Sequence, residues 1–172
     1  MPTKFFWKTS SAKAHEQSIP VMDVKRDFSL LSNVFSEYGC KRTVFDWDFV
    51  MIGPDDTLYE GGTFNGKIIF PPSYPHKPPQ VKFTSKIVHP NIYLNGKVCI
   101  SILHEGVDQY GYEDVSERWS PTQSINSIMM SILSLFSCPN FDSPANVDYA
   151  VLYKKNYDLY KKQIYAIIAN SN

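Results

Sequence analysis

The sequence predicts an α+β domain in which a group of strands is followed by helices. Two patterns in the 172-residue chain carry this prediction. Residues 45–85 contain short segments of alternating apolar and polar side chains, separated by glycines and prolines, which is typical of successive β-strands. Residues 120–168 instead repeat apolar side chains every three or four positions, as helices with one buried face do. Strands grouped ahead of helices favour an α+β architecture.

The first predicted strand begins at Phe45. Phe45, Trp47, Phe49 and Met51 alternate with two aspartates, and this period of two is that of a strand with one buried face. The glycine, proline and two aspartates at 53–56 supply the turn that ends the strand.

Two further strands are predicted on either side of a proline-rich loop. The second follows Gly61-Gly62, with Phe64, Ile68 and Phe70 on one face, and the third covers residues 80–85. The prolines of residues 71–79 fix φ and remove N–H donors, so we expect a rigid loop outside the sheet. Short links between successive strands predict an antiparallel meander.

The next helix is predicted to begin at Ser120. Ser120 suits the N-cap, Pro121 the first helical position, and Gln123 the partner in a capping box. One helix face then repeats apolar residues until a stop at 138–140: Ile125, Ile128, Met129, Ile132 and Leu135. A second apolar stripe near the C-terminus predicts core packing: Tyr153, Tyr157, Tyr160, Ile164 and Ile168.

Composition predicts one compact domain and excludes several functions. A chain with 43% hydrophobic residues is long enough for one substantial core. Seventeen basic and seventeen acidic side chains cancel, so the basic footprint of a nucleic-acid or anionic-membrane binder is missing. No apolar run approaches the roughly 20 residues of a membrane span. We therefore expect a cytoplasmic protein without direct membrane insertion.

Three motifs carry the functional signal. They are His89-Pro90-Asn91-Ile92-Tyr93, a cysteine eight residues past the asparagine at Cys99, and the tryptophan, serine and proline at 119–121. Together they resemble the catalytic core of ubiquitin-conjugating enzymes. The match continues through residues 99–104, the acidic stretch after them, and residues 143–148. It is similar to the Ubc7-like branch, which carries an acidic insertion beside the active cysteine and is linked to protein degradation.

This resemblance implies a fold and a division of the chain. The fold has an N-terminal helix, a four-stranded antiparallel meander and further C-terminal helices. Residues 41–172 would form the catalytic core. Residues 1–40 would be a divergent N-terminal segment that includes the first helix, either at 27–35 or at 12–17.

The resemblance also implies an activity without metal or cofactor. The enzyme would accept ubiquitin on Cys99 from an activating enzyme, which spends the ATP, and pass it to a lysine. The implied partners are ubiquitin, the activating enzyme, a ubiquitin ligase of the RING type and protein substrates. Degradation-type polyubiquitin chains and recruitment to the endoplasmic reticulum surface by partners are further expectations. Two other classes remain: a non-catalytic ubiquitin-binding variant and a thiol hydrolase, the latter lacking an evident base.

Cys99 is the candidate nucleophile. A thiol can accept an acyl group and pass it to an amine without a metal. Taken alone, a cysteine between Val98 and Ile100 would more often be a buried core residue, but the resemblance favours the thioester role. Cys138 ends an apolar helix and is expected to be buried. An odd number of cysteines without a C-x-x-C pair favours reduced thiols.

The histidine motif offers several candidate roles. His89 could act as a protease-like base, but the resemblance implies that it orders the loop. Asn91 is the second catalytic candidate, because its amide could stabilise the oxyanion formed when lysine attacks the thioester. The alternative is that this amide only ties down the loop. Tyr93 matches a position that packs against the incoming lysine, or it belongs to the core.

The attacking lysine must lose a proton, since the pKa of free lysine is about 10.4. A carboxylate at the mouth of the site could orient the amine and accept its proton. By resemblance, this position falls at Ser143 or at the adjacent Asp142. His104 is a candidate gate beside the cysteine, or a solvent-exposed loop histidine.

Two surfaces complete the predicted site. An acidic flap follows Cys99, either attracting basic groups or simply solvated, and its carboxylates are Glu105, Asp108, Glu113, Asp114 and Glu117. The loop 72–79 and the residues after Trp119 match the two ligase-binding loops of the family. Their candidate contacts are Pro72, Tyr74, His76, Ser120 and Pro121.

Overall fold

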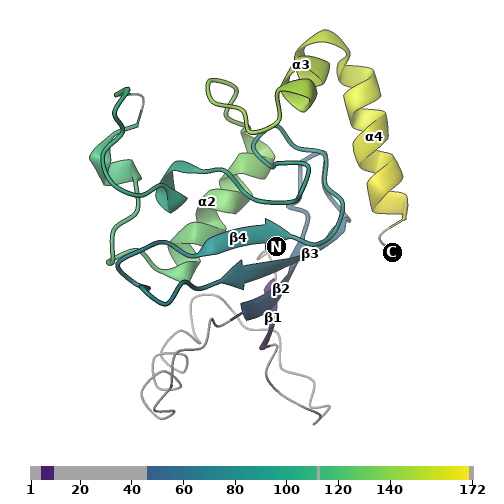
Figure 1. Ribbon diagram of the computed structural model, residues 1–172. Helices are drawn as coiled ribbons and strands as arrows, with labels where there is room; N and C mark the ends of the chain where they lie inside the picture. Colours follow the sequence, from purple (N-terminus) through teal and green to yellow (C-terminus); the bar gives the residue numbers. More distant parts are fainter. Residues whose placement is uncertain (1–4, 10–45, 112, 171–172) are drawn as a thin grey trace.

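The computed structural model describes residues 5–9, 46–111 and 113–170 (Figure 1). The strands β1 (Phe5–Thr9), β2 (Asp46–Ile52), β3 (Thr63–Ile69) and β4 (Gln80–Phe83) form one antiparallel sheet in the order β1-β2-β3-β4. The predicted four-stranded meander is therefore confirmed. Strands β2, β3 and β4 correspond to the three strands expected from the alternating pattern, and β1 is the additional strand at the edge of the sheet. The predicted first helix, at 27–35 or 12–17, lies outside the described residues.

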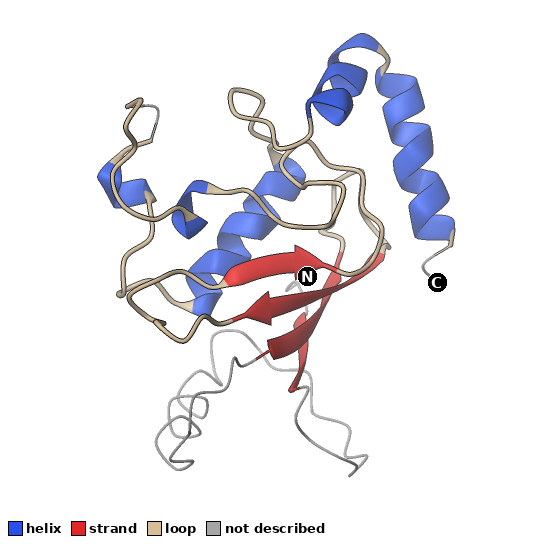
Figure 2. Ribbon diagram, in the orientation of Figure 1, coloured by secondary structure: helices blue, strands red, loops and turns tan. Residues whose placement is uncertain are grey.

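The alternation predicted for the central strands is confirmed by their burial. Trp47, Phe49 and Met51 of β2 are buried, as are Phe64 and Ile68 of β3. These side chains belong to one core cluster with buried residues of α2 (Ile125–Ser137), the helix that lies against the sheet (Figure 2).

Strand β4 ends two residues earlier than predicted. The amides of Thr84 and Ser85 both donate to the carbonyl oxygen of Asn65, at 2.8 and 3.1 Å. This shared acceptor bends the chain away from the ladder after Phe83. The following segment then runs across the molecule toward the candidate site.

The predicted start of the next helix is wrong. Helix α2 begins at Ile125 with Ser124 as its N-cap, whose hydroxyl accepts from the amide of Ser127 at 3.1 Å. The Ser127 hydroxyl in turn accepts from the Ser124 amide at 3.0 Å. This reciprocal pair satisfies the first helical amides, whereas Ser120 only closes a preceding turn by accepting from the Gln123 amide. The predicted end, at Cys138, is confirmed.

The C-terminal stripe is divided between two helices, α3 (Val147–Lys155) and α4 (Tyr157–Ala169). Asn156 separates them: it ends α3, and its side chain caps α4 by accepting from the amide of Leu159 at 3.1 Å. Tyr160 and Ile164 are buried as predicted, but Tyr157, the first residue of α4, is 42% exposed, so its predicted place in the core is wrong. No helix in the described ranges combines the length and apolarity that a membrane span needs.

Candidate active site

The loop between β4 and the cysteine is organised around His89, which is fully buried. Its Nδ1 accepts from the amide of Asn91 at 3.0 Å, so Nε2 carries the proton and donates to the carbonyl of Leu135 at 2.9 Å. Burial lowers the pKa of His89 to about 4, against the bond to Leu135, and keeps the ring neutral at physiological pH. Because both ring nitrogens are engaged, the protease-like role for His89 has no geometric support.

Asn91 is equally buried and faces Asn140, a residue that the sequence analysis did not single out. The Asn91 side chain donates from Nδ2 to the Asn140 carbonyl at 2.6 Å and accepts from the Asn140 amide at 2.9 Å. This pair connects the histidine loop to the segment after α2. The backbone carbonyl of Asn91 also accepts from the amide of Cys99 at 3.0 Å. Asn91 thus fixes the position of the histidine loop. Its Nδ2 also has a second hydrogen besides the one that it donates to the Asn140 carbonyl.

A tight turn brings Tyr93 back beside Cys99. The Tyr93 amide donates to the Lys97 carbonyl at 2.9 Å, and Gly96 occupies the turn at φ 85°. A Cβ on Gly96 would lie 2.0 Å from the carbonyl oxygen of Phe83, so only glycine fits. The Tyr93 hydroxyl lies 4.0 Å from the Cys99 sulfur. Since Tyr93 is 42% exposed, the alternative of a core tyrosine is wrong.

His104 lies directly beside the candidate nucleophile. Its Nε2 is 3.5 Å from the Cys99 sulfur, and its Nδ1 lies 2.9 and 3.0 Å from the two carboxylate oxygens of Glu113. A carboxylate only accepts, so Nδ1 donates and the lone pair of Nε2 faces the sulfur in the neutral tautomer. The alternative of a solvent-exposed loop histidine is therefore wrong. The expectation that no base stands near the cysteine is also wrong.

The surroundings shift the pKa values of Cys99 and Glu113 in opposite directions. Desolvation raises the pKa of the Cys99 thiol, the hydrogen bond from Tyr93 lowers it, and the net shift is upward. Desolvation also acts to raise the pKa of Glu113, but hydrogen bonds from His104 and Ser101 outweigh it and lower that pKa. Cys99 is thus a thiol and Glu113 a carboxylate at neutral pH.

Arg118 anchors the acidic insertion, a role that the sequence analysis did not foresee. Its guanidinium donates to the carbonyls of Gly106 and Glu105, both at 2.7 Å, and to the carboxylate of Glu113. Only 12% of the Arg118 side chain is exposed. The sequence did carry a signal for this role, because Arg118 is the one basic residue after a run of acidic ones. A partly buried carboxylate needs a positively charged partner, and Arg118 was the residue that could supply it.

The predicted acidic flap is an ordered loop rather than a row of free charges. Asp108 accepts from the amides of Tyr110 and Glu113, both at 3.0 Å, and Asp114 caps a 3-10 turn (Val115–Glu117). Glu105 pairs with Lys77 at 3.6 Å across the mouth of the site. Asp108 and Asp114 therefore bond to groups of the flap itself, whereas Glu113 bonds to Ser101, His104 and Arg118 on either side of it.

Asp142 and Ser143 are not brought to the sulfur. Both are exposed, and their amides bond to the side chain of Asn140, at 2.9 and 3.4 Å. Neither is among the residues that line the hollow beside Cys99. A role for either in the approach of a lysine stays a prediction.

The two predicted ligase-binding loops lie side by side. Trp119 connects them, because its indole N–H donates to the carbonyl of Pro75 at 2.9 Å and its ring lies 6.0 Å from that of Tyr74. Tyr74 is half-buried against Phe70. The other candidate contacts, Pro72, His76, Ser120 and Pro121, are exposed or half-exposed on the same two loops.

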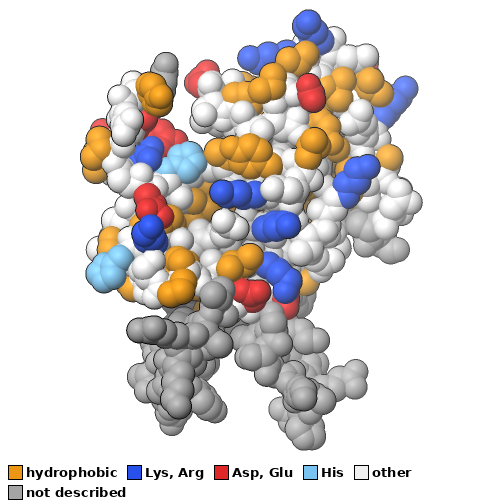
Figure 3. All heavy atoms as spheres, viewed as in Figure 1, with side chains coloured by type: hydrophobic (Ala, Val, Ile, Leu, Met, Phe, Trp, Pro, Cys, Tyr) orange, Lys and Arg blue, Asp and Glu red, His pale blue; other side chains and the backbone are white. Residues whose placement is uncertain are grey.

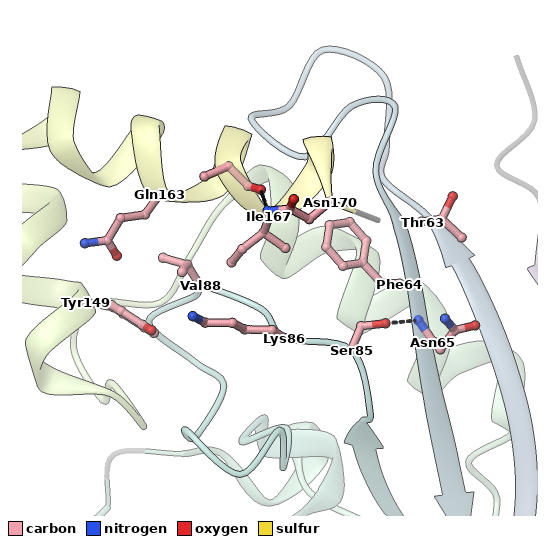
Figure 4. A pocket seen from close by; sticks show the side chains of 11 residues that line it. Thr63, Phe64, Asn65, Ser85, Lys86, Val88, Tyr149, Gln163, Ile167 and Asn170 are labelled. Atoms are coloured by element: carbon pink, nitrogen blue, oxygen red, sulfur yellow. Dashed lines mark hydrogen bonds between the residues drawn. The ribbon is translucent and has the colours of Figure 1, made fainter. Parts of the chain in front are cut away.

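A hollow of about 440 Å³ opens beside Cys99. His104 and Glu105 line one part of it, and Tyr93 and Lys97 line another. A larger hollow of about 690 Å³ lies elsewhere, between α4, the start of β3 and the loop after β4 (Figure 4). It shares no lining residue with the Cys99 hollow.

Cys138, the other cysteine that the structure describes, is exposed, contrary to the prediction of a buried side chain. It lies at the end of α2, where the chain leaves the core. Cys40 lies outside the described residues. Among the residues that are described, no cluster of histidine, cysteine and carboxylate side chains could hold a metal ion.

A half-buried thiol with an imidazole and a carboxylate behind it is the equipment of an enzyme that carries an acyl group on cysteine, and it fits both a transferase and a hydrolase. Comparison with known sequences gives the family: the sequence model for "Ubiquitin-conjugating enzyme" matches residues 22–168. The chain belongs to the ubiquitin-conjugating enzyme family, whose members are ubiquitin transferases with a thioester intermediate.

Individual relatives agree with this assignment. The chain is 48% identical over 131 residues to "Ubiquitin-conjugating enzyme E2 15" of Schizosaccharomyces pombe, covering 76% of this chain and 78% of the relative. It is 49% identical over 132 residues to "Ubiquitin-conjugating enzyme E2 7" of Arabidopsis thaliana, covering 76% and 80%. A viral "Ubiquitin-conjugating enzyme E2", from African swine fever virus, is 52% identical over 118 residues, covering 67% and 51%. As a member of this family, the protein works with ubiquitin, an activating enzyme and ligases.

Proposed function

We propose that this enzyme carries ubiquitin as a thioester on Cys99 and builds degradation-type polyubiquitin chains with a RING-type ligase. The observation that carries the proposal is the contact between the Cys99 sulfur and His104, which Glu113 orients from the acidic flap. ATP is used by the activating enzyme. We place the enzyme in the cytoplasm, recruited to the endoplasmic reticulum surface by its partners.

In the charging step, Cys99 attacks the thioester that the activating enzyme presents. Its raised pKa means that the thiol must lose a proton to react. The Nε2 of His104 stands 3.5 Å away and can accept that proton. The activating enzyme's sulfur leaves as a thiolate, and ubiquitin's carboxyl group becomes the acyl group on Cys99.

In the transfer step, a lysine attacks the carbonyl carbon of the thioester on Cys99. His104 then faces the thioester and can take a proton from the ammonium group, which leaves a neutral amine to attack the carbonyl carbon. The nitrogen of the tetrahedral intermediate loses its extra proton to water, and the intermediate collapses to the amide with release of the Cys99 sulfur as a thiolate. This thiolate takes back the proton held on His104. Glu113 keeps the imidazole in the tautomer that this step needs. The remaining Nδ2 hydrogen of Asn91 is proposed to stabilise the oxyanion.

The ligase is proposed to dock on the two loops that Trp119 connects. Tyr74 and Pro72 come from one loop, and Ser120 and Pro121 from the other. The exposed ring of His76 replaces the large apolar side chain that the family resemblance leads one to expect there. We therefore expect a ligase whose contact surface tolerates an imidazole at this point.

The experiment that tests the proposal is a charging assay on a non-reducing gel with activating enzyme, ubiquitin and ATP. We expect an adduct that reducing agent removes and that Cys99→Ala abolishes. Cys138→Ala is the matched control, because it removes the other described thiol, which is exposed. Loss of the adduct in Cys138→Ala with retention in Cys99→Ala would contradict the assignment.

A thiol hydrolase is the second candidate, and the position of His104 favours it. The raised pKa of Cys99 argues against it, because cysteine hydrolases lower the pKa of their nucleophile. The two functions differ in the fate of the charged enzyme. A transferase keeps its ubiquitin until an amine is added, whereas a hydrolase loses ubiquitin at the same rate with and without lysine.

A further inference from the structure

Three lysines occupy facing positions on the exposed side of the sheet and its extension. Lys67 of β3 lies opposite Lys82 of β4, and Lys82 lies opposite Lys97 across an isolated bridge. Facing residues of antiparallel strands place their side chains on the same side, with Cβ atoms about 5 Å apart. An adjacent residue in each segment is buried in the core: Ile68, Val81 and Val98. The lysines therefore point outward, and we call them the lysine row.

This arrangement costs stability unless an anion compensates it, because like charges that face one another across strands repel. Lys67 has such a partner, since its ammonium lies 3.1 Å from Asp48. Lys82 and Lys97 form no ion pair within the part of the chain that the structure describes. Two neighbouring cations thus remain available for a negative group.

The lysine row ends at the active site. Lys97 lines the same hollow as Cys99, from which it is two residues away in the chain. His104 and Glu105, at the base of the acidic flap, line the hollow as well. Figure 3 shows basic side chains near the centre of this face, and acidic side chains both beside a histidine and just below the basic group.

We infer that the lysine row binds an acidic side chain that flanks the target lysine in the acceptor protein. The flap attracts the lysine, and the row attracts the neighbouring carboxylate, so the segment is drawn across Cys99 in one orientation. An extended chain rises about 3.3 Å per residue, and Lys97 is two residues from Cys99. An aspartate or glutamate two to four residues from the acceptor lysine would therefore reach the row. The inference rests on Cys99 as the thioester residue.

The test uses single-turnover discharge of ubiquitin from the full-length charged enzyme to synthetic peptides that contain one lysine. One peptide has neutral flanks, a set carries one glutamate two or four residues to either side, and a matched set carries arginine. We expect at least one glutamate peptide to react about twofold to fivefold faster than the neutral one, the range that exposed ion pairs support. The preference should disappear near 1 M salt, where charges act over only about 3 Å.

Charge reversal identifies the side chains responsible. Lys82→Glu and Lys97→Glu should each lose the preference for glutamate peptides and favour the arginine peptides. Lys86→Glu is the matched control, because it makes the same charge change on an exposed lysine that lines the other hollow (Figure 4). It should keep the wild-type ratio. Using the ratio between peptides removes any effect of a variant on its overall rate.

The outcomes separate this inference from the proposed function. Failure of the wild-type enzyme to form a thioester would overturn both. Normal charging with equal discharge to all peptides would overturn the inference alone. An acidic preference that survives in both Lys82→Glu and Lys97→Glu would also overturn it, since the carboxylate would then be bound elsewhere. Lys82→Glu decides the question if Lys97→Glu, next to the nucleophile, cannot be charged.

Discussion

At the scale of single residues, the site depends on a side chain whose partner the sequence did not reveal. His104 is five residues from Cys99 and nine from Glu113 in the sequence. These spacings alone do not predict that the chain folds back and brings Glu113 into contact with His104. The return depends on Arg118, which holds two carbonyls and one carboxylate of the intervening loop. The position of the His104 imidazole beside Cys99 thus depends on the whole insertion.

A prediction for His104 follows from its proposed role as a base for the attacking lysine. His104→Gln should slow discharge to free lysine at pH 7 by about 10²-fold, a usual contribution of a positioned base. The defect should shrink as the pH rises toward about 10.4, the pKa of free lysine, because more of the amine is then neutral without help. Single-turnover discharge between pH 7 and 9.5 measures this.

Hydroxylamine is the control for His104, because this amine is largely neutral at pH 7 and needs no base. Discharge to hydroxylamine should be nearly unchanged in His104→Gln, and Glu113→Gln should reproduce the lysine-specific defect in weaker form. An equal loss with both nucleophiles, constant across the pH range, would mean that His104 only supports the shape of the site.

A second prediction separates the two roles of Asn91. Asn91→Asp keeps an oxygen that accepts from the Asn140 amide at 2.9 Å in the native protein, but loses the Nδ2 donor. If that donor stabilises the oxyanion, discharge to lysine should fall by about 10²-fold or more, while charging falls much less. Both rates are read from the same gels.

Asn91→Ala is the comparison variant, because it removes both bonds between the Asn91 side chain and the backbone of Asn140, which is an exposed residue. It should lower the free energy of unfolding by about 1 kcal/mol, the usual net contribution of a hydrogen bond. If Asn91→Asp and Asn91→Ala lose charging and discharge in equal proportion, Asn91 acts only through the order of the loop.

At the scale of elements, sequence patterns located the strands and helices better than their ends. Burial fixes the face of β2 and β3, so their alternation was visible in the sequence. Ends depend on single hydrogen bonds that several residues compete to make. Ser120 and Ser124 both suited the N-cap of α2, and the reciprocal bond with Ser127 selected the second. Asn156 divided the C-terminal stripe in the same way.

The histidine loop yields a prediction about stability and pH. The pKa of His89 falls from its ordinary value of about 6.5 to about 4 on folding. The unfolded chain therefore binds more protons between these values, and the contribution of His89 to stability is complete above pH 6.5 and is lost as the pH falls toward 4. The expected loss is about 3 kcal/mol over this range. Urea unfolding of the wild type at pH 4 to 7.5 measures it.

His89→Gln is the variant for this comparison, because glutamine can still donate to the Leu135 carbonyl but does not titrate. It should be less stable than the wild type at pH 7, and its stability should fall less steeply between pH 6.5 and 4. Contributions from the other titrating groups cancel in the difference between the two proteins. Parallel stability curves would show that His89 is not the buried neutral group that the structure places there.

At the scale of the whole molecule, zero net charge conceals two separate fields around Cys99. The acidic flap lies to one side and the lysine row to the other, with the hollow between them. Composition could not predict this separation, because residues 67, 82 and 97 become neighbours only through strand pairing. Exposed charges act over about 8 Å at physiological salt, so each field acts on its own side of the site.

The last prediction concerns the flap in chain building. A second ubiquitin must bring a lysine to the thioester, and exposed carboxylates raise its local concentration. Glu105 and Glu117 are the carboxylates to neutralise, because Asp108, Glu113 and Asp114 also hold the loop together. The double variant Glu105→Gln/Glu117→Gln should charge normally. It should form di-ubiquitin about twofold to fivefold more slowly at low salt, with a flatter dependence on salt.

The matched control for the flap is Glu60→Gln/Asp158→Asn, which removes the same charge from exposed positions away from the Cys99 hollow. This control should keep the wild-type rate and salt dependence in single-turnover di-ubiquitin formation. A similar loss in both double variants would trace the effect to net charge rather than to the flap. Unchanged rates and salt slopes in Glu105→Gln/Glu117→Gln would leave the flap a purely structural loop, whose contribution is to hold Glu113 against His104.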